Sequence, residues 1–239
     1  MVDFYGGTLS VPVNLDTSNI VLYSLTKHFE KLLGVLSEIL LEPAFPEEEL
    51  EIFKKNNKQR LQVDLTKNDV VAYRAVTEKI FSPTHPYGYN SQAETYDNLS
   101  RKELLNHFDR NFHAGNCQIV ISGKTSPKII NLLNEYIGKT LVRKEVVKSN
   151  VIEMFPPAEK VKIHLPDTLQ TAIRLGCKLF NRQHEDYNDF YILNTILGGY
   201  FGSRLMSTIR EEKGYTYNIF STLDPMHFDG YFYVGTEVG

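Results

Sequence analysis

Two side chains near the C-terminal end of the sequence, Arg210 and Tyr217, have the chemistry needed to recognise the polar groups of a ligand. A guanidinium offers several N–H donors in one plane, which suit carbonyl or carboxylate oxygens, and a phenol offers one directional hydroxyl. A simpler interpretation is that Arg210 pairs with a nearby acid and Tyr217 packs with its hydroxyl in water, because charges on helices are usually solvated. Residue types alone leave both interpretations open.

The elements that would position this pair are indicated by the stretch 197–217, which reads LGGYFGSRLMSTIREEKGYTY. Its glycines, Gly202 among them, indicate tight turns or a close approach of two backbones. Ser203 stands where an N-cap is expected, and a helix should follow. The apolar face of that helix would comprise three residues: Phe201, Leu205 and Ile209. Gly214 should end the helix, and the alternating pattern beyond it predicts a strand with Tyr217 at its head.

The run GGYFGSRL followed by IREEKGYTY resembles, in order and spacing, the signature of the second homologous domain of the M16 metallopeptidase family. This family includes insulin-degrading enzyme and mitochondrial processing peptidase. In it, an arginine and a tyrosine spaced as Arg210 and Tyr217 are here hold the backbone of the substrate peptide across from the zinc. The resemblance therefore implies that these two residues bind substrate.

The first half of the sequence is also similar to this family. LLGVLSEILLEPAFPEEELEIFKK, the THPYG loop and QIVISGK occur in the order of the first M16 domain, starting just after its zinc-binding helix. The resemblance implies an α+β fold with two tandem homologous domains, each a largely antiparallel sheet packed with helices. We expect the first domain at 1–140, a linker at 141–158 and an incomplete second domain at 159–239. The polypeptide is thus expected to be a fragment cut at both ends.

The residues that a zinc peptidase of this family requires are not visible in the sequence. Such an enzyme needs two histidines in an inverted H-x-x-E-H motif and a distant glutamate. No two of the seven histidines are three or four residues apart. By the family's spacing the third ligand should fall at 58–62, where Arg60 places a positive charge instead of a carboxylate. We expect no catalytic residue, metal ligand or cofactor in this chain, with zinc supplied by a partner or by a missing upstream segment.

Hydrophobic periodicity predicts the remaining elements. Helices are expected at 27–42, from 45 onward, and at 69–81, 100–111, 127–137 and 187–197. Strands are expected at 8–13, 19–25, 118–122, 160–165, 171–179, 217–223 and 231–235. Ser100 and Glu103 predict a capping box. Cys117 and Cys177 lie in apolar, strand-like runs and are interpreted as free core thiols.

Composition and charge exclude several classes of partner. The formal net charge is −3, so no basic excess attracts nucleic acid or an anionic membrane. No apolar run is long enough to span a bilayer, and no signal peptide is visible. A soluble protein is expected, cytoplasmic or periplasmic if bacterial.

The resemblance favours a non-catalytic, substrate-binding M16 subunit or fragment, inactive by itself, that grips extended peptides for proteolysis by a zinc-bearing partner. A homo- or heterodimer with such a subunit is expected. Two alternatives stay open: a truncated piece of a self-sufficient zinc metalloendopeptidase, and a non-proteolytic scaffold subunit.

Overall fold

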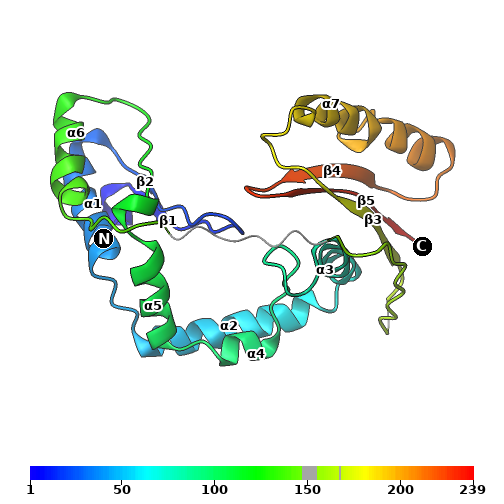
Figure 1. Ribbon diagram of the computed structural model, residues 1–239, viewed down its shortest axis with the longest axis horizontal. Coiled ribbons are helices and arrows are strands. Elements are labelled where there is room, and N and C mark those ends of the chain that lie inside the picture. The colour runs from blue at the N-terminus through cyan, green and yellow to red at the C-terminus, as the bar shows by residue number, and fades with distance from the viewer. Residues whose placement is uncertain (147–154, 167) are drawn as a thin grey trace. The chain divides into compact units, whose positions relative to one another are not determined.

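The structure, a computed structural model, describes residues 1–146, 155–166 and 168–239 of the 239-residue chain (Figure 1). It combines helices with two antiparallel sheets, which confirms the predicted α+β class. The chain forms two compact units, Met1–Lys55 with Asp97–Ser149 and Asn56–Tyr96 with Asn150–Gly239. Of the predicted linker 141–158, residues 147–154 lie outside the described residues. The proposed homology between the two halves of the sequence stays a prediction.

The first unit contains a small sheet of β1 (Thr8–Ser10) and β2 (Val21–Tyr23), which pair antiparallel as predicted but are shorter than expected. Its helices were also expected from the sequence: α1 (Phe29–Leu41), the start of α2 (Glu47–Asp64), α5 (Arg101–Asn111) and α6 (Pro127–Leu133). Short helical turns accompany them: η1 (Asp3–Tyr5), η2 (Thr26–His28), η3 (Ala114–Asn116) and the π-helical η4 (Asn134–Gly138).

Local signals and burial explain why these helices form. At the start of α5, Ser100 and Glu103 form the predicted capping box, in which each side chain bonds the other residue's backbone N–H. In α1, Leu32 and Leu33 are fully buried, as the apolar periodicity of this segment requires. The Ser37 hydroxyl on the same helix donates to the Tyr136 carbonyl at 2.7 Å and so links α1 to η4.

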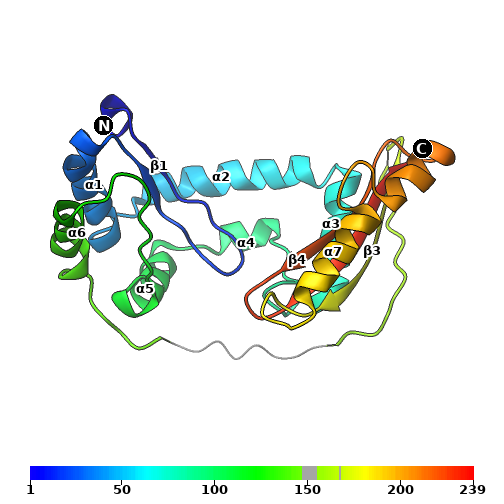
Figure 2. The ribbon, with the colours of Figure 1, turned by 90° about the horizontal axis from the view of Figure 1, so that it is seen from above.

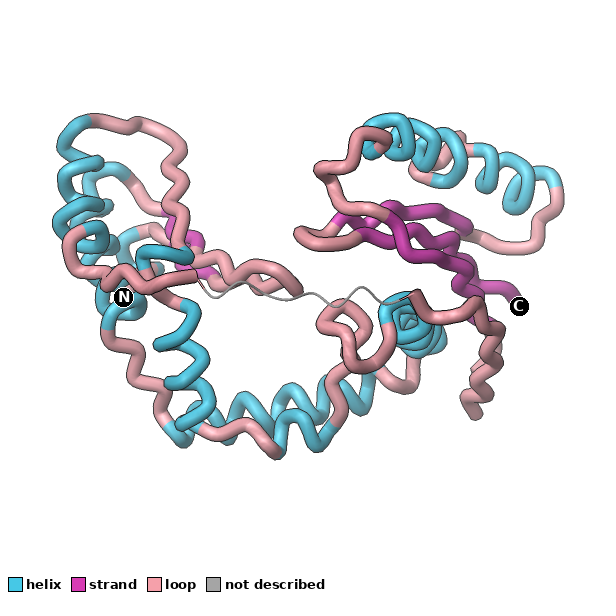
Figure 3. The backbone as a smooth tube through the Cα atoms, in the orientation of Figure 1, coloured by secondary structure: helices cyan, strands magenta, loops and turns pink. Residues whose placement is uncertain are grey.

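The second unit is built on a three-stranded antiparallel sheet. Its strands are β3 (Thr171–Leu179), β4 (Ile219–Pro225) and β5 (Gly230–Val238), in the order β3-β5-β4. Helix α3 (Asn68–Phe81) packs against β3, and α7 (Tyr187–Gly198) covers the opposite face near β4 (Figures 1 and 2). Figure 3 shows this sheet between helical layers. The short α4 (Ala93–Asp97) follows the loop after α3.

The core on the α3 side of the sheet is largely aromatic. Its buried members are Ile80, Phe81, Tyr87, Tyr231 and Tyr233. The rings of Phe81 and Tyr231 meet edge to face with centroids 5.7 Å apart, a favoured geometry for aromatic pairs. The THPYG loop therefore contributes Tyr87 to the core.

Two predicted strands, 118–122 and 160–165, are wrong: the structure has loops there. Ile119 and Val120 have the β-branched side chains typical of strands, yet they are 50% and 81% exposed. A strand exists only when a neighbouring backbone accepts and donates its hydrogen bonds. In the described residues the sheet of the first unit consists of β1 and β2 alone, and it offers 118–122 no ladder.

The prediction of two core thiols is also wrong, although both cysteines are free. Cys177 lies on β3, where burial alternates along the strand, and its side chain is on the exposed face. Cys117 is exposed because it precedes the stretch that forms a loop instead of a buried strand. A run of apolar residues predicts extended backbone but does not determine which face is covered.

Candidate functional site

Arg210 lies on a π-helix, η5 (Met206–Glu212), and not on the ordinary α-helix that the sequence predicts. The wider turn is seen in the hydrogen bond from the Lys213 N–H to the Thr208 carbonyl, at 3.2 Å. π-Helical turns are rare in proteins, but those that occur are often found at functional sites. Such a turn changes the direction in which the following side chains project. The register of Arg210 therefore depends on this turn.

Ser203 precedes the helical segment but does not cap it with its hydroxyl, so this prediction is wrong. The side chain is only 1% exposed, and its Oγ has no hydrogen-bond partner among the described residues. The Ser203 carbonyl instead accepts from the Ser207 N–H at 2.9 Å. The small size of the Ser203 side chain suits this buried position.

The expected close approach of backbones occurs at Gly198, the last residue of α7. A Cβ atom added there would lie 2.4 Å from the backbone nitrogen of Ser221 on β4 and 2.6 Å from its Oγ. Since real Cβ atoms do not approach other atoms this closely, only glycine allows α7 to rest on β4. This contact holds the C-terminal end of α7 close to β4.

Gly214 ends the helical segment, as predicted. Its φ of 65° lies in the left-handed region that favours glycine. The Gly214 N–H donates to the Arg210 carbonyl at 3.1 Å, and the Tyr215 N–H donates to the Ile209 carbonyl at 3.2 Å. This pattern is typical of a glycine C-cap, and it turns the chain from Arg210 toward Tyr217.

Arg210 and Tyr217 line the same surface hollow, of about 850 Å³, which lies entirely in the second unit. The other side chains that line it are aromatic, acidic or hydrogen-bonding: Gln170, Phe201, Glu211, Tyr215, Thr216 and Glu237. Of these lining residues, the sequence predicted only Arg210 and Tyr217 as recognition residues. Four of the others belong to the same stretch 197–217 as Arg210 and Tyr217, whereas Gln170 and Glu237 come from segments distant in sequence.

The guanidinium of Arg210 is stacked on an aromatic ring and not paired with an acid. Its central carbon lies 4.7 Å from the centroid of Phe201, a distance suited to a cation–π contact. Within the described part of the chain, Arg210 forms no ion pair, although Glu211 is adjacent in sequence. Phe201, expected on the apolar face of a helix, is 65% exposed and supports this cation. The arginine charge is left available to a ligand.

Tyr217 lies in the loop before β4, because that strand begins at Ile219 and not at Tyr217 as predicted. Its side chain is 89% exposed. The hydroxyl can therefore reach a ligand without displacing any part of the protein. Glu211 and Glu237 add carboxylates to the lining of the hollow, so the cation of Arg210 stands in a mixed charge environment.

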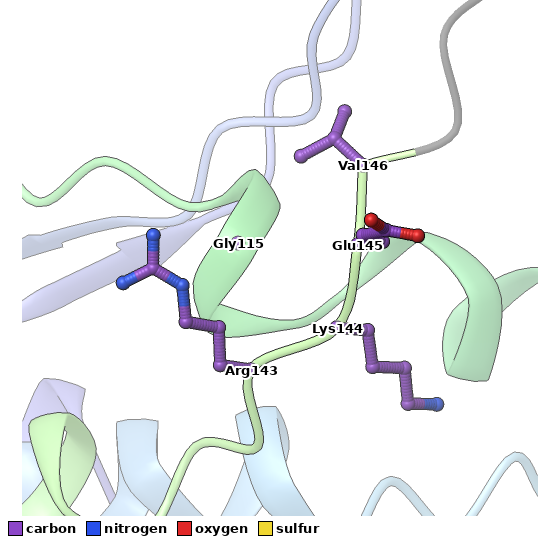
Figure 4. A pocket seen from close by; sticks show the side chains of 5 residues that line it. All are labelled: Gly115, Arg143, Lys144, Glu145 and Val146. Atoms are coloured by element: carbon purple, nitrogen blue, oxygen red, sulfur yellow. The ribbon is translucent and has the colours of Figure 1, made fainter.

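A second hollow, of about 360 Å³, lies in the first unit and is shown in Figure 4. The side chains of Arg143 and Lys144 at its edge point in different directions. The ammonium of Lys144 bonds the Asp109 carboxylate at 2.5 Å. This hollow does not bring a set of reactive groups together.

Metal-ligating side chains do not cluster in the part of the chain that the structure describes: no group of three or more His, Cys, Asp or Glu could hold an ion there. In the window where a third zinc ligand was considered, the Arg60 side chain is 81% exposed on α2 and lies 3.8 Å from Asp64. A hydrogen bond from Lys67 lowers the pKa of that carboxyl, with a smaller contribution from the charge of Arg60.

None of the helices in the described ranges has the length and apolar character required to cross a bilayer.

The chain was compared with models of known protein families. The model of the peptidase M16 inactive domain matches residues 98–239, more than half of the chain, including the whole stretch with Arg210 and Tyr217. The chain belongs to the M16 peptidase family. Its matched part corresponds to the domain of that family described as inactive.

Relatives of this M16 chain carry contrasting names. "Uncharacterized zinc protease YmxG" of Bacillus subtilis is 24% identical over 199 residues, which cover 82% of this chain and 48% of that protein. "Non-peptidase homolog YmxG" of Helicobacter pylori is 24% identical over 226 residues, 88% of this chain and 50% of that protein. The M16 chain thus spans about half the length of these relatives.

Among solved structures, the peptidase M16 inactive domain from Pseudomonas fluorescens superposes with a TM-score of 0.91 at 25% identity. The match covers 99% of this M16 chain and 58% of the other. The fold of this M16 chain is therefore similar to that of an M16 inactive domain.

Proposed function

We propose that this chain is the substrate-binding, non-catalytic part of an M16 peptidase, in which Arg210 and Tyr217 hold an extended peptide for cleavage by a zinc-bearing partner. The observation that carries the proposal is that Tyr217 and an arginine without an ion-pair partner among the described residues line one hollow. Its volume of about 850 Å³ falls within the range of roughly 300–1,000 Å³ usual for ligand sites.

The donor set matches the groups that repeat along every peptide. The guanidinium of Arg210 has only donors, which suit carbonyl oxygens, while the Tyr217 hydroxyl can donate to a carbonyl or accept from an amide N–H. A charge that is not neutralised within the protein forms stronger, charge-assisted hydrogen bonds with a ligand. Because these contacts address the backbone, selectivity for side chains should be loose.

Direct binding tests the proposal. Fluorescence anisotropy would measure the Kd of the chain for several unstructured, dye-labelled peptides of unrelated sequence. Arg210→Ala should raise each Kd about tenfold or more, a loss of roughly 1.4 kcal/mol. The Kd of Arg210→Lys should lie between those of the wild type and Arg210→Ala, because lysine keeps the charge but lacks the planar fork of donors. Tyr217→Phe should weaken binding less, since one neutral hydrogen bond is lost.

Arg204→Ala is the matched control, because Arg204 is an exposed arginine on the same helical segment and does not line the hollow. It should leave the Kd unchanged. Equal effects of the two alanine variants would show that only net charge matters, and an unchanged Kd for Arg210→Ala would contradict the proposal.

The proposed roles of this chain and of a zinc-bearing partner must be tested in the assembled enzyme. In that complex, Arg210→Ala should raise KM or lower kcat about tenfold or more without changing the zinc content of the partner. Peptidase activity of this chain by itself, lost on chelation, would instead support a self-sufficient zinc peptidase. Stable association with an assembly that cleaves no peptide would support a scaffold.

A further inference from the structure

The loop that carries Tyr217 is fastened to the sheet by a cluster of hydroxyl groups. Thr216, directly before Tyr217, is half-buried, and its Oγ1 lies 2.5 Å from the carbonyl oxygen of Glu237 on β5. The Asn218 N–H, directly after Tyr217, donates to the same Oγ1 at 3.2 Å. This one hydroxyl therefore links the backbone directly after Tyr217 to the backbone of β5.

Thr236 on β5 completes this cluster. Its hydroxyl lies 3.0 Å from the Thr216 Oγ1 and 2.9 Å from the Asn218 carbonyl, so it can donate to either. Each threonine has one hydroxyl proton and two lone pairs. The arrangement is consistent when Thr216 donates to Glu237 and accepts from Asn218 and Thr236.

The position of this cluster in the sheet explains its effect. Thr236 pairs with Ile219, the first residue of β4, so the cluster lies at the end of the β4–β5 ladder. The other end of the same loop is fixed by the glycine C-cap at Gly214. The backbone at Tyr217 is thus held at both ends, while its side chain remains 89% exposed.

We propose that Thr216, supported by Thr236, is a positioning residue that holds the Tyr217 hydroxyl at the correct place relative to Arg210 for peptide binding. This inference rests on the proposed function. Thr216 lines the hollow but acts through Tyr217: its hydroxyl is directed at protein backbone, and removing it would leave the Glu237 carbonyl and the Asn218 N–H without this partner. The loop would then sample other conformations before a peptide binds, which weakens binding.

The first measurement requires no peptide. Amide hydrogen exchange, followed by NMR, reports whether the Asn218 N–H is protected in the free chain. Thr216→Val, which replaces the hydroxyl by a methyl group, should accelerate exchange of this amide about tenfold or more, whereas Thr216→Ser should keep it slow. Thr222→Val is the matched control, because Thr222 lies on β4 outside the cluster and the hollow.

The second measurement is a double-mutant cycle on peptide affinity. In the wild-type background Tyr217→Phe should raise the Kd clearly, and in the Thr216→Val background it should add less than about twofold, because Tyr217 is no longer held. Arg210→Ala should keep its full effect in both backgrounds. In a Thr216→Ser background, Tyr217→Phe should raise the Kd as much as it does in the wild type. In a Thr236→Val background, the effect of Tyr217→Phe on the Kd should be reduced, as it is with Thr216→Val.

These results separate the failure of the inference from that of the proposed function. Unchanged Asn218 exchange in Thr216→Val, or an undiminished effect of Tyr217→Phe in that background, would overturn the positioning role. If the wild-type chain binds no peptide, the proposed function fails and the positioning role with it, whereas the exchange data still decide whether Thr216 holds the loop. Thermal unfolding of each variant would verify that it is folded.

Discussion

The guanidinium of Arg210 lies over the ring of Phe201, with its central carbon 4.7 Å from the ring centroid. Phe201 belongs to the turn after α7 and Arg210 to the π-helix, so the contact joins two successive segments of the candidate site. It holds the cation at the edge of the hollow without neutralising it.

Removal of the Phe201 ring should weaken peptide binding through Arg210. An exposed cation–π contact contributes about 0.5–1 kcal/mol, so Phe201→Leu should raise the Kd roughly two- to fivefold, whereas Phe201→Tyr should not. In an Arg210→Ala background the effect of Phe201→Leu should vanish. An equal effect in both backgrounds would mean that the ring contacts the peptide directly.

Peptide binding by this chain should not depend on zinc. Arg210 and Tyr217 bind through N–H and O–H groups, which require no metal. The Kd should therefore be the same before and after dialysis against a zinc chelator, and elemental analysis should find less than stoichiometric zinc. Loss of affinity on chelation that added zinc restores would show that a metal takes part in the site.

Gly198→Ala should destabilise the second unit, because the added methyl group would overlap Ser221 on β4. Overpacking of this kind costs about 1–3 kcal/mol, measurable by urea unfolding. Gly34→Ala in α1 is the matched control: its Cβ would lie 3.6 Å from the Tyr136 ring, an ordinary contact, and alanine favours the helix. A stable Gly198→Ala variant would contradict the described contact between α7 and β4.

His85 should make the protein less stable in acid. Its Nδ1 accepts from the Tyr87 N–H at 3.1 Å, which assigns the proton to Nε2, and the side chain is 3% exposed. Burial lowers the pKa of His85 below its ordinary 6.5; the nearby Asp229 opposes this shift and Lys178 adds to it. The unfolded chain therefore binds a proton more readily, and the free energy of unfolding should fall as the pH drops below about 6.5.

The measurement is urea unfolding between neutral and mildly acidic pH. His85→Asn keeps an acceptor near the Nδ1 position and should remove up to about 1.4 kcal/mol per pH unit of this dependence. His107→Asn, at an exposed position on α5, is the control. If His85→Asn left the pH profile unchanged, this histidine would not be the group that titrates.

Tyr231 should make the protein sensitive to alkali. Its ring is 1% exposed and its hydroxyl lies 2.6 Å from that of Tyr73. Burial, and then the hydrogen bond with Tyr73, raise the pKa of Tyr231 far above its ordinary value of 10.0. The folded state keeps the phenol neutral, so stability is fully present below pH 10 and should fall above it, as the unfolded chain ionises.

Alkaline unfolding of Tyr231→Phe checks this expectation. The variant should lose stability less steeply above pH 10 than the wild type, whereas Tyr23→Phe, at an exposed position on β2, should not change the slope. Parallel curves for the wild type and Tyr231→Phe would contradict an effect of burial on this phenol.

The sequence by itself determined the elements whose signals are local. Apolar periodicity predicted α1 and β3, the capping box of Ser100 set the start of α5, and Gly214 marked the end of the segment that carries Arg210. Such signals depend on a residue and its near neighbours, and they can be read without knowing the partners of a segment. The resemblance to the M16 family rested on motifs in both halves of the sequence and was confirmed.

Tertiary structure decided what depends on distant partners. The stretch 118–122 has strand-forming residues but forms a loop, because the described residues offer it no ladder. The π-helical register of Arg210, the exposed position of Phe201 beneath it and the hydroxyl of Thr216 on the Glu237 carbonyl follow from contacts that no spacing reveals. The sequence predicted Arg210 and Tyr217, and four more lining side chains lie in the same stretch 197–217. Gln170 and Glu237 come from distant segments, which meet this stretch only after the strands have paired.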